Sequence, residues 1–139
     1  SGIETALFLK NIFPKAKFLF LVRNPFDTID SIKKRNWIDQ EDSANPLLFY
    51  AKHWKRLANE FKQADFGLLI KYEDLISEQF DIQKLRNYLN IPNIPSNFVK
   101  ESNANWTTNN LTELSFLEKW VLSYYLRNEL NIYGYKCLK

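Results

Sequence analysis

Hydrophobic residues form two short uninterrupted runs, Phe18 to Val22 and Gly67 to Lys71, each of strand length. Such continuous runs are typical of strands that are buried on both faces of a parallel sheet. Between the two runs, apolar residues recur three or four positions apart, which predicts a helix of about 18 residues. Its apolar positions are Leu47, Tyr50, Ala51, Trp54, Leu57, Ala58 and Phe61. This order predicts an α/β fold in which parallel strands are flanked by helices.

Three further helices are predicted. One covers residues 3–12 and ends before Pro14, because a proline disfavours helical geometry at the residue before it. A short helix covers 82–89 and stops near Pro92. The last long helix is predicted to begin at an N-cap, Thr112. We expect its buried face to comprise Leu114, Leu117, Val121 and Tyr124, widened by Phe116, Trp120 and Tyr125.

Two strands are too few for a sheet of this kind. Strands with continuous apolar sequences require helices on both faces and neighbouring strands at both edges. We therefore expect residues 1–139 to be part of a larger domain. The remainder has either been removed or is supplied by another chain.

Composition and charge exclude several classes of protein. The chain is 45% apolar and 25% charged, as in globular domains, and contains no apolar run of the roughly 18 residues that span a membrane. The single cysteine, Cys137, excludes an intrachain disulfide and a cysteine-based metal cluster. A net charge of +3 without clustered basic residues does not indicate nucleic-acid binding, whereas anionic ligands remain compatible with it.

The end of the first strand carries the strongest candidate for chemistry. Arg23 follows the strand directly, and Asn24 and Pro25 are favoured residues for starting a helix. Ligands of open parallel sheets bind beyond the carboxyl ends of the strands, and a guanidinium suits a phosphate. Ser31, about two helical turns later, is able to donate to the same anion. The residues leave two interpretations open: an anion site, or a surface arginine that is paired with Asp27.

The segment FPKAKFLFLVRNPFDTIDS, residues 13–31, resembles the 3′-phosphate-binding motif of sulfotransferases that use 3′-phosphoadenosine 5′-phosphosulfate (PAPS). Nine residues stand in register with that motif: Phe13, Pro14, Ala16, Lys17, Arg23, Asn24, Pro25, Asp27 and Ser31. LLIKYEDL, residues 68–75, is similar to the family's strand that ends in Y-E-D-L. LTELSFLEKW and YGY resemble its C-terminal helix and final G-Y.

The resemblance implies a partial P-loop-type sulfotransferase fold with a helix-rich C-terminal part, in which residues 1–139 are the C-terminal portion of a single domain. It implies that Arg23 and Ser31 hold the 3′-phosphate of the cofactor and that Tyr72 lies near the adenine. Glu73 and Asp74 are expected to cap the turn that follows them. Lys100 is a further phosphate candidate, although its segment, KESNANW, matches the family's late motif poorly, and a solvated lysine is the alternative.

The implied reaction transfers a sulfuryl group from PAPS to a hydroxyl or amine of a small-molecule or glycan acceptor and leaves adenosine 3′,5′-bisphosphate. The family's K-S-G-T loop and its general base do not occur in this sequence, so we assign no catalytic residue and no metal site. We expect His53, the only histidine, to lie on a helix surface. The alternative function is a non-catalytic sulfotransferase-like module, or half of a split domain, that associates through an exposed sheet edge.

Overall fold

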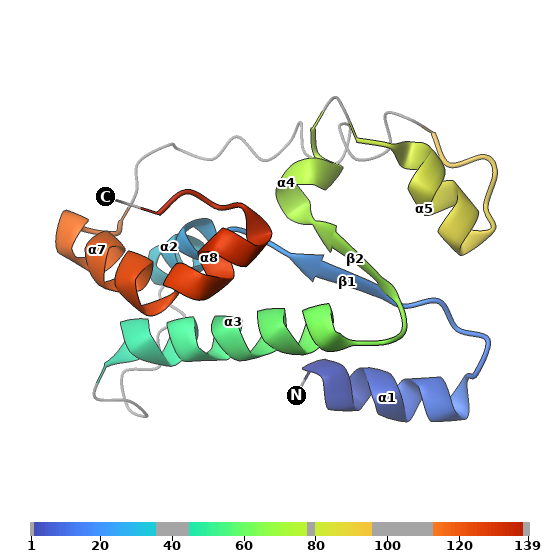
Figure 1. Ribbon diagram of the computed structural model, residues 1–139, viewed down its shortest axis with the longest axis horizontal. Coiled ribbons are helices and arrows are strands. Elements are labelled where there is room, and N and C mark those ends of the chain that lie inside the picture. The colour runs from blue at the N-terminus through green and yellow to red at the C-terminus, as the bar shows by residue number, and fades with distance from the viewer. Residues whose placement is uncertain (1, 36–44, 78–79, 96–112, 138–139) are drawn as a thin grey trace.

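The computed structural model describes residues 2–35, 45–77, 80–95 and 113–137 (Figure 1). Its elements, in chain order, are α1 (Gly2–Ile12), β1 (Leu19–Val22), α2 (Pro25–Lys34), α3 (Pro46–Gln63), β2 (Leu68–Lys71), α4 (Tyr72–Leu75), α5 (Ile82–Leu89), α7 (Phe116–Tyr125) and α8 (Arg127–Tyr133). The predicted strands and the helices before residue 90 are confirmed within two residues at each end.

Strands β1 and β2 pair in parallel, with Leu19 opposite Leu68 and Val22 opposite Lys71. The connection between them runs through α2 and α3. Helix α3 contacts α1, α2, α7 and α8, and Figure 1 shows it lying along these helices, with α5 at the opposite end of the molecule from α7. The predicted α/β class, with parallel strands flanked by helices, is therefore confirmed.

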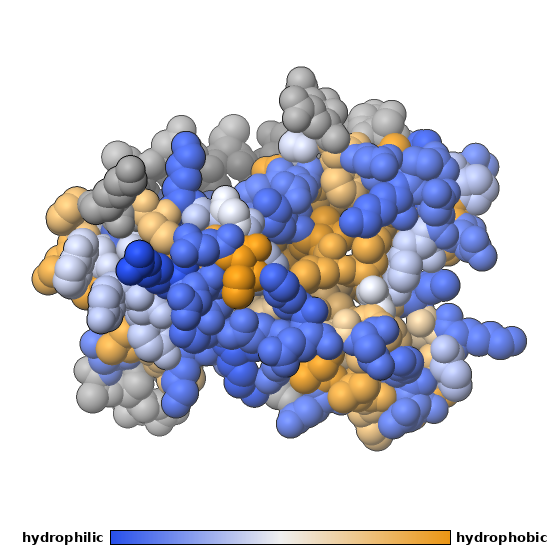
Figure 2. Space-filling model, in the orientation of Figure 1, coloured by the Kyte–Doolittle hydropathy of each residue, from blue (hydrophilic) through white to orange (hydrophobic). Residues whose placement is uncertain are grey.

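The expected burial of the first strand on both faces is wrong. Phe20 and Val22 are buried, whereas Leu19 and Leu21 are 46% and 49% exposed. Side chains alternate across a strand, and only one face of β1 is covered by described helices, so its other face remains open. Figure 2 shows apolar surface over the region of the two strands.

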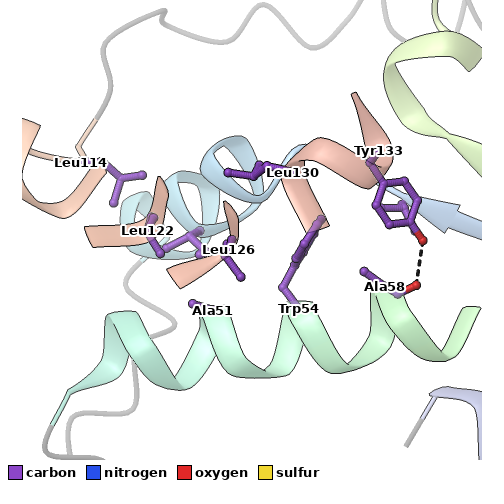
Figure 3. Packing of buried hydrophobic residues seen from close by; sticks show 10 residues of the cluster. Ala51, Trp54, Ala58, Leu114, Leu122, Leu126, Leu130 and Tyr133 are labelled. Carbon is purple, nitrogen blue, oxygen red and sulfur yellow. Dashed lines mark hydrogen bonds between the residues drawn. The ribbon is translucent and has the colours of Figure 1, made fainter. Parts of the chain in front are cut away.

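The core lies between α3 and the two C-terminal helices (Figure 3). Ala51 on α3 and Leu122, Leu126 and Leu130 on the opposite side are completely buried. The Tyr133 hydroxyl donates a hydrogen bond of 2.7 Å to the backbone carbonyl of Ala58. Burying a large aliphatic side chain contributes about 1.5–3 kcal/mol, so this cluster holds the C-terminal helices on α3.

The C-terminal helix differs from its prediction in start, length and buried face. It begins after Ser115, whose side chain and Glu118 form a reciprocal capping box, while Thr112 lies outside the described residues. The helix breaks at Leu126, where α8 follows. Leu117, Tyr124, Phe116 and Trp120, which were expected to be buried, are 68%, 77%, 73% and 50% exposed.

Candidate functional site

The parallel register brings Arg23 and Tyr72 together at the carboxyl edge of the sheet. Val22 and Lys71 are paired as the last residues of their strands, and the two candidate residues follow them directly. The Arg23 guanidinium carbon lies 4.9 Å from the centre of the Tyr72 ring. Such a cation over an aromatic face is stabilised by about 0.5–1 kcal/mol and also fixes the plane of the guanidinium.

Arg23 forms no salt bridge with an acidic residue among the described residues. None of their ion pairs includes it, and its buried Nε atom has no hydrogen-bond partner. The direct salt bridge to Asp27 that the second interpretation supposes is thus absent from the described ion pairs. Partial burial raises the pKa of Asp27, the Arg23 charge acts against this, and the charges of Glu73 and Asp30 raise it further. The guanidinium therefore retains donors for an anionic ligand.

The backbone around Arg23 is held by side chains from three distant parts of the chain. Trp54 of α3 donates its indole N–H to the Arg23 carbonyl at 2.9 Å. Glu73 of α4 accepts the Asn24 N–H at 2.7 Å, and the Tyr135 hydroxyl donates to the other oxygen of that carboxylate at 2.8 Å. The side chain of Glu73 thus holds the turn after β1. It was expected to cap the turn that follows α4, and that expectation is wrong. Asp74 pairs with Lys71 at 3.4 Å.

Helix α2 begins as predicted and carries Ser31. The Asn24 side chain accepts the Phe26 N–H at 2.9 Å, and Pro25 is the first helical residue. Ser31 is partly buried, and its hydroxyl has no hydrogen-bond partner among the described residues. It stands six residues after Pro25, about 9 Å along the helix axis, so one anion meets both residues only if the long Arg23 side chain reaches along α2 toward Ser31.

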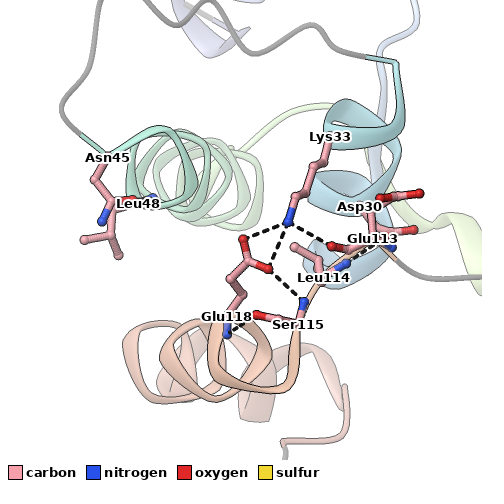
Figure 4. A network of polar contacts seen from close by, with 8 residues as sticks. All are labelled: Asp30, Lys33, Asn45, Leu48, Glu113, Leu114, Ser115 and Glu118. Atoms are coloured by element: carbon pink, nitrogen blue, oxygen red, sulfur yellow. Dashed lines mark hydrogen bonds and ion pairs between the residues drawn. The ribbon is translucent and has the colours of Figure 1, made fainter.

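Polar contacts on both sides of Ser31 hold α2 to the start of α7 (Figure 4). One carboxylate oxygen of Asp30 accepts the N–H groups of Glu113 and Leu114, at 2.6 and 3.2 Å. Lys33 donates to the Glu113 carbonyl at 2.8 Å and pairs with Glu118 at 2.9 Å. These contacts fix the orientation of the helix that carries Ser31.

Two hollows adjoin the strand ends. A cavity of about 210 Å³ lies against Arg23 and is otherwise lined by Leu21, Val22, Thr28, Trp54, Leu57, Ala58 and Phe61. A second cavity, of about 430 Å³, is lined by Leu69, Ile70, Lys71, Asp74, Ser77, Phe80, Asp81, Lys84 and Tyr133. The walls of the first cavity are mainly apolar with a few polar groups, as is typical of binding sites for small organic molecules, whereas charged and polar residues make up much of the wall of the second.

The remaining sequence candidates are Lys100 and His53. Lys100 falls outside the described residues. His53 is exposed on α3, with its Nδ1 atom 3.5 Å from an Arg56 nitrogen, so the predicted surface position is confirmed. Within the described ranges, no group of acidic, histidine or cysteine side chains is arranged to hold a metal ion, and no helix has the length and apolar character needed to cross a membrane.

Comparison with known proteins assigns this chain to a family. A model of the sulfotransferase family matches residues 2–95, a range that contains Arg23, Ser31 and Tyr72 but not Lys100. No curated protein and no solved structure matches the chain. Because the matched range covers well over half of the sequence and includes both parallel strands, the chain belongs to the sulfotransferase family.

Proposed function

We propose that this chain binds the 3′-phosphate of PAPS and takes part in transferring the sulfuryl group to a hydroxyl or amine acceptor. The observation that supports the proposal most is the Arg23 guanidinium. It stands at the carboxyl edge of a parallel sheet, stacked on Tyr72, and forms no salt bridge with an acidic residue among the described residues. Residues 1–139 would form the C-terminal portion of the sulfotransferase domain.

The donors on the described residues suit a phosphate. In this proposal Arg23 provides two N–H groups for charge-assisted hydrogen bonds, and the Ser31 hydroxyl donates a third. Tyr72, whose ring already carries the guanidinium, lies near the adenine.

PAPS would supply the sulfuryl group, and the residues named here would hold the 3′-phosphate and the adenine of that cofactor. The product that remains bound is adenosine 3′,5′-bisphosphate. The acceptor would be a small molecule or a glycan, whose hydroxyl or amine has to lose a proton to a general base. No described residue is assigned that role.

Isothermal titration of the chain with adenosine 3′,5′-bisphosphate and with adenosine 5′-monophosphate tests the proposal. Arg23→Ala is expected to weaken bisphosphate binding about tenfold to a hundredfold, because hydrogen bonds to charged groups contribute about 1.5–3 kcal/mol. The same substitution should leave the weaker monophosphate binding unchanged, since that ligand lacks the 3′-phosphate. Arg127→Ala, at an exposed position on α8, is the matched control.

The two ligands separate a phosphate contact from a general loss of folding. A variant that merely unfolds would lose both ligands, whereas loss of the 3′-phosphate contact affects the bisphosphate alone. Ser31→Ala should show the same selectivity with a smaller loss, and Lys100→Ala tests the further phosphate candidate. Equal bisphosphate binding by wild type and Arg23→Ala would refute the site.

The second candidate function is association with another chain through the open side of the sheet. The observation that favours it is the half-exposed pair Leu19 and Leu21 on β1. If association is the function, sedimentation velocity should show a concentration-dependent dimer, and this dimer should disappear when both leucines are replaced by serine. A wild-type chain that stays monomeric at all concentrations tested contradicts this candidate.

A further inference from the structure

We infer that Glu73 is a positioning residue for the phosphate site, because it fixes the turn from which Arg23 extends. This inference rests on the proposed function. Glu73 does not contact the ligand in this arrangement. It acts through the backbone N–H of Asn24, the residue after Arg23.

Both carboxylate oxygens of Glu73 are occupied by other groups. Oε1 accepts the Asn24 N–H at 2.7 Å, and Oε2 accepts the Tyr135 hydroxyl at 2.8 Å. An acidic residue this close to Arg23 would otherwise compete with a phosphate for the guanidinium. Because both oxygens are engaged and Glu73 forms no ion pair with Arg23, the cation remains available to a ligand.

The hydrogen bond from Asn24 to Glu73 takes the place of one that helices often form within their own first turn. In a capping box, the third helical residue accepts the N–H of the N-cap residue. In α2 that third residue is Asp27, but the Asn24 N–H is taken by Glu73, which lies 49 positions away in the sequence. The start of α2 is thereby tied to the end of β2, and Arg23 is tied to Tyr72.

Tyr135 completes the arrangement from the C-terminal segment. Its hydroxyl donates to Glu73 and also lies 3.5 Å from the Val22 carbonyl. Burial, together with the nearby Glu73 charge, raises the pKa of Tyr135 well above its usual value. The phenol therefore stays protonated and remains a donor at neutral pH, which holds the Glu73 carboxylate in place.

The test compares Glu73→Ala with Glu73→Gln in the whole chain. Both variants remove the negative charge, but only glutamine keeps an oxygen that accepts the Asn24 N–H. We expect Glu73→Gln to bind adenosine 3′,5′-bisphosphate at least as tightly as wild type. Glu73→Ala should bind it about tenfold more weakly than Glu73→Gln. Without the contact that fixes the turn, binding would have to immobilise the long Arg23 side chain, and this costs free energy. Asp74→Ala, the neighbouring acid on α4, should bind like wild type.

Amide hydrogen exchange at Asn24, followed by NMR, provides a measurement without ligand. Exchange should accelerate at least tenfold in Glu73→Ala and stay at the wild-type rate in Glu73→Gln and Asp74→Ala. Tyr135→Phe should produce a smaller acceleration of the same amide, because it removes one of the two groups that hold the carboxylate. Thermal unfolding of each variant shows whether it is folded under the conditions of the titration.

The outcomes separate this inference from the proposed function. If wild type does not bind the bisphosphate, the proposed function fails and the inference fails with it. If wild type binds but Glu73→Ala and Glu73→Gln bind equally well, Glu73 has no positioning role while the proposed function stands. Unchanged exchange at Asn24 in Glu73→Ala would also overturn the inference.

Discussion

Replacing Trp54 by phenylalanine tests how far the core and the Arg23 turn depend on one side chain. The indole is 9% exposed and donates to the Arg23 carbonyl at 2.9 Å. Phenylalanine keeps a ring in the core but removes the donor and part of the ring volume. The lost hydrogen bond costs about 1 kcal/mol, and the small cavity adds about 1–2 kcal/mol. We predict a total loss of about 2–3 kcal/mol in the free energy of unfolding.

Urea unfolding followed by far-ultraviolet circular dichroism measures this loss without relying on tryptophan fluorescence. In thermal unfolding the same loss corresponds to a melting temperature lower by about 6–9 °C for a chain of this size. Trp120→Phe is the matched control, because Trp120 is 50% exposed on α7, and it should cost less than about 0.5 kcal/mol. Equal losses in the two variants, or a loss below about 1 kcal/mol for Trp54→Phe, would refute the reasoning.

Two further predictions concern the strand connection and the contact between α2 and α7. Gly67 has a φ of +88°, and a Cβ there would lie 2.6 Å from the Phe20 ring, so Gly67→Ala should cost more than about 1 kcal/mol in urea unfolding; a neutral substitution would contradict this strain. Burial acts to raise the pKa of Glu118, but hydrogen bonds from Lys33 and Ser115 outweigh it and hold that pKa below its ordinary 4.5. Glu118 therefore contributes stability above pH 4.5 that is lost as the pH falls through the folded-state pKa, about 0.5 kcal/mol. Glu118→Gln should be less stable than wild type at pH 7, and the difference should disappear as the pH falls through the folded-state pKa of Glu118; a difference that persists in acid would contradict the assignment.

Local signals in the sequence predicted the elements around the site. Asn24 and Pro25 marked the start of α2 because an N-cap side chain and a proline at the first helical position act within one turn. The closeness of Arg23 and Tyr72 follows from two strands of equal length that pair in parallel and end together. Features that depend on neighbouring residues, or on one pairing of strands, were therefore accessible.

Features that depend on contacts between distant residues could not be predicted from the sequence. The burial of Leu19 and Leu21 depends on what covers the second face of β1, which an apolar run cannot indicate. In α7, apolar and aromatic residues surround the helix, so their spacing did not reveal which face packs on α3. One signal was present and was missed: Ser115 and Glu118 have the spacing of a capping box and mark the true helix start. The contact between Glu73 and Asn24 leaves no local trace.

The hydroxyl of Tyr135 lies 3.5 Å from the carbonyl of Val22, a contact between residues 113 positions apart. Residues 22–24 are synthesised well before Tyr135, so the emerging chain cannot form this contact until Tyr135 has left the ribosome. Closing so long a loop costs entropy that short-range contacts do not. The turn after β1 should therefore become fully ordered only after Tyr135 has been synthesised.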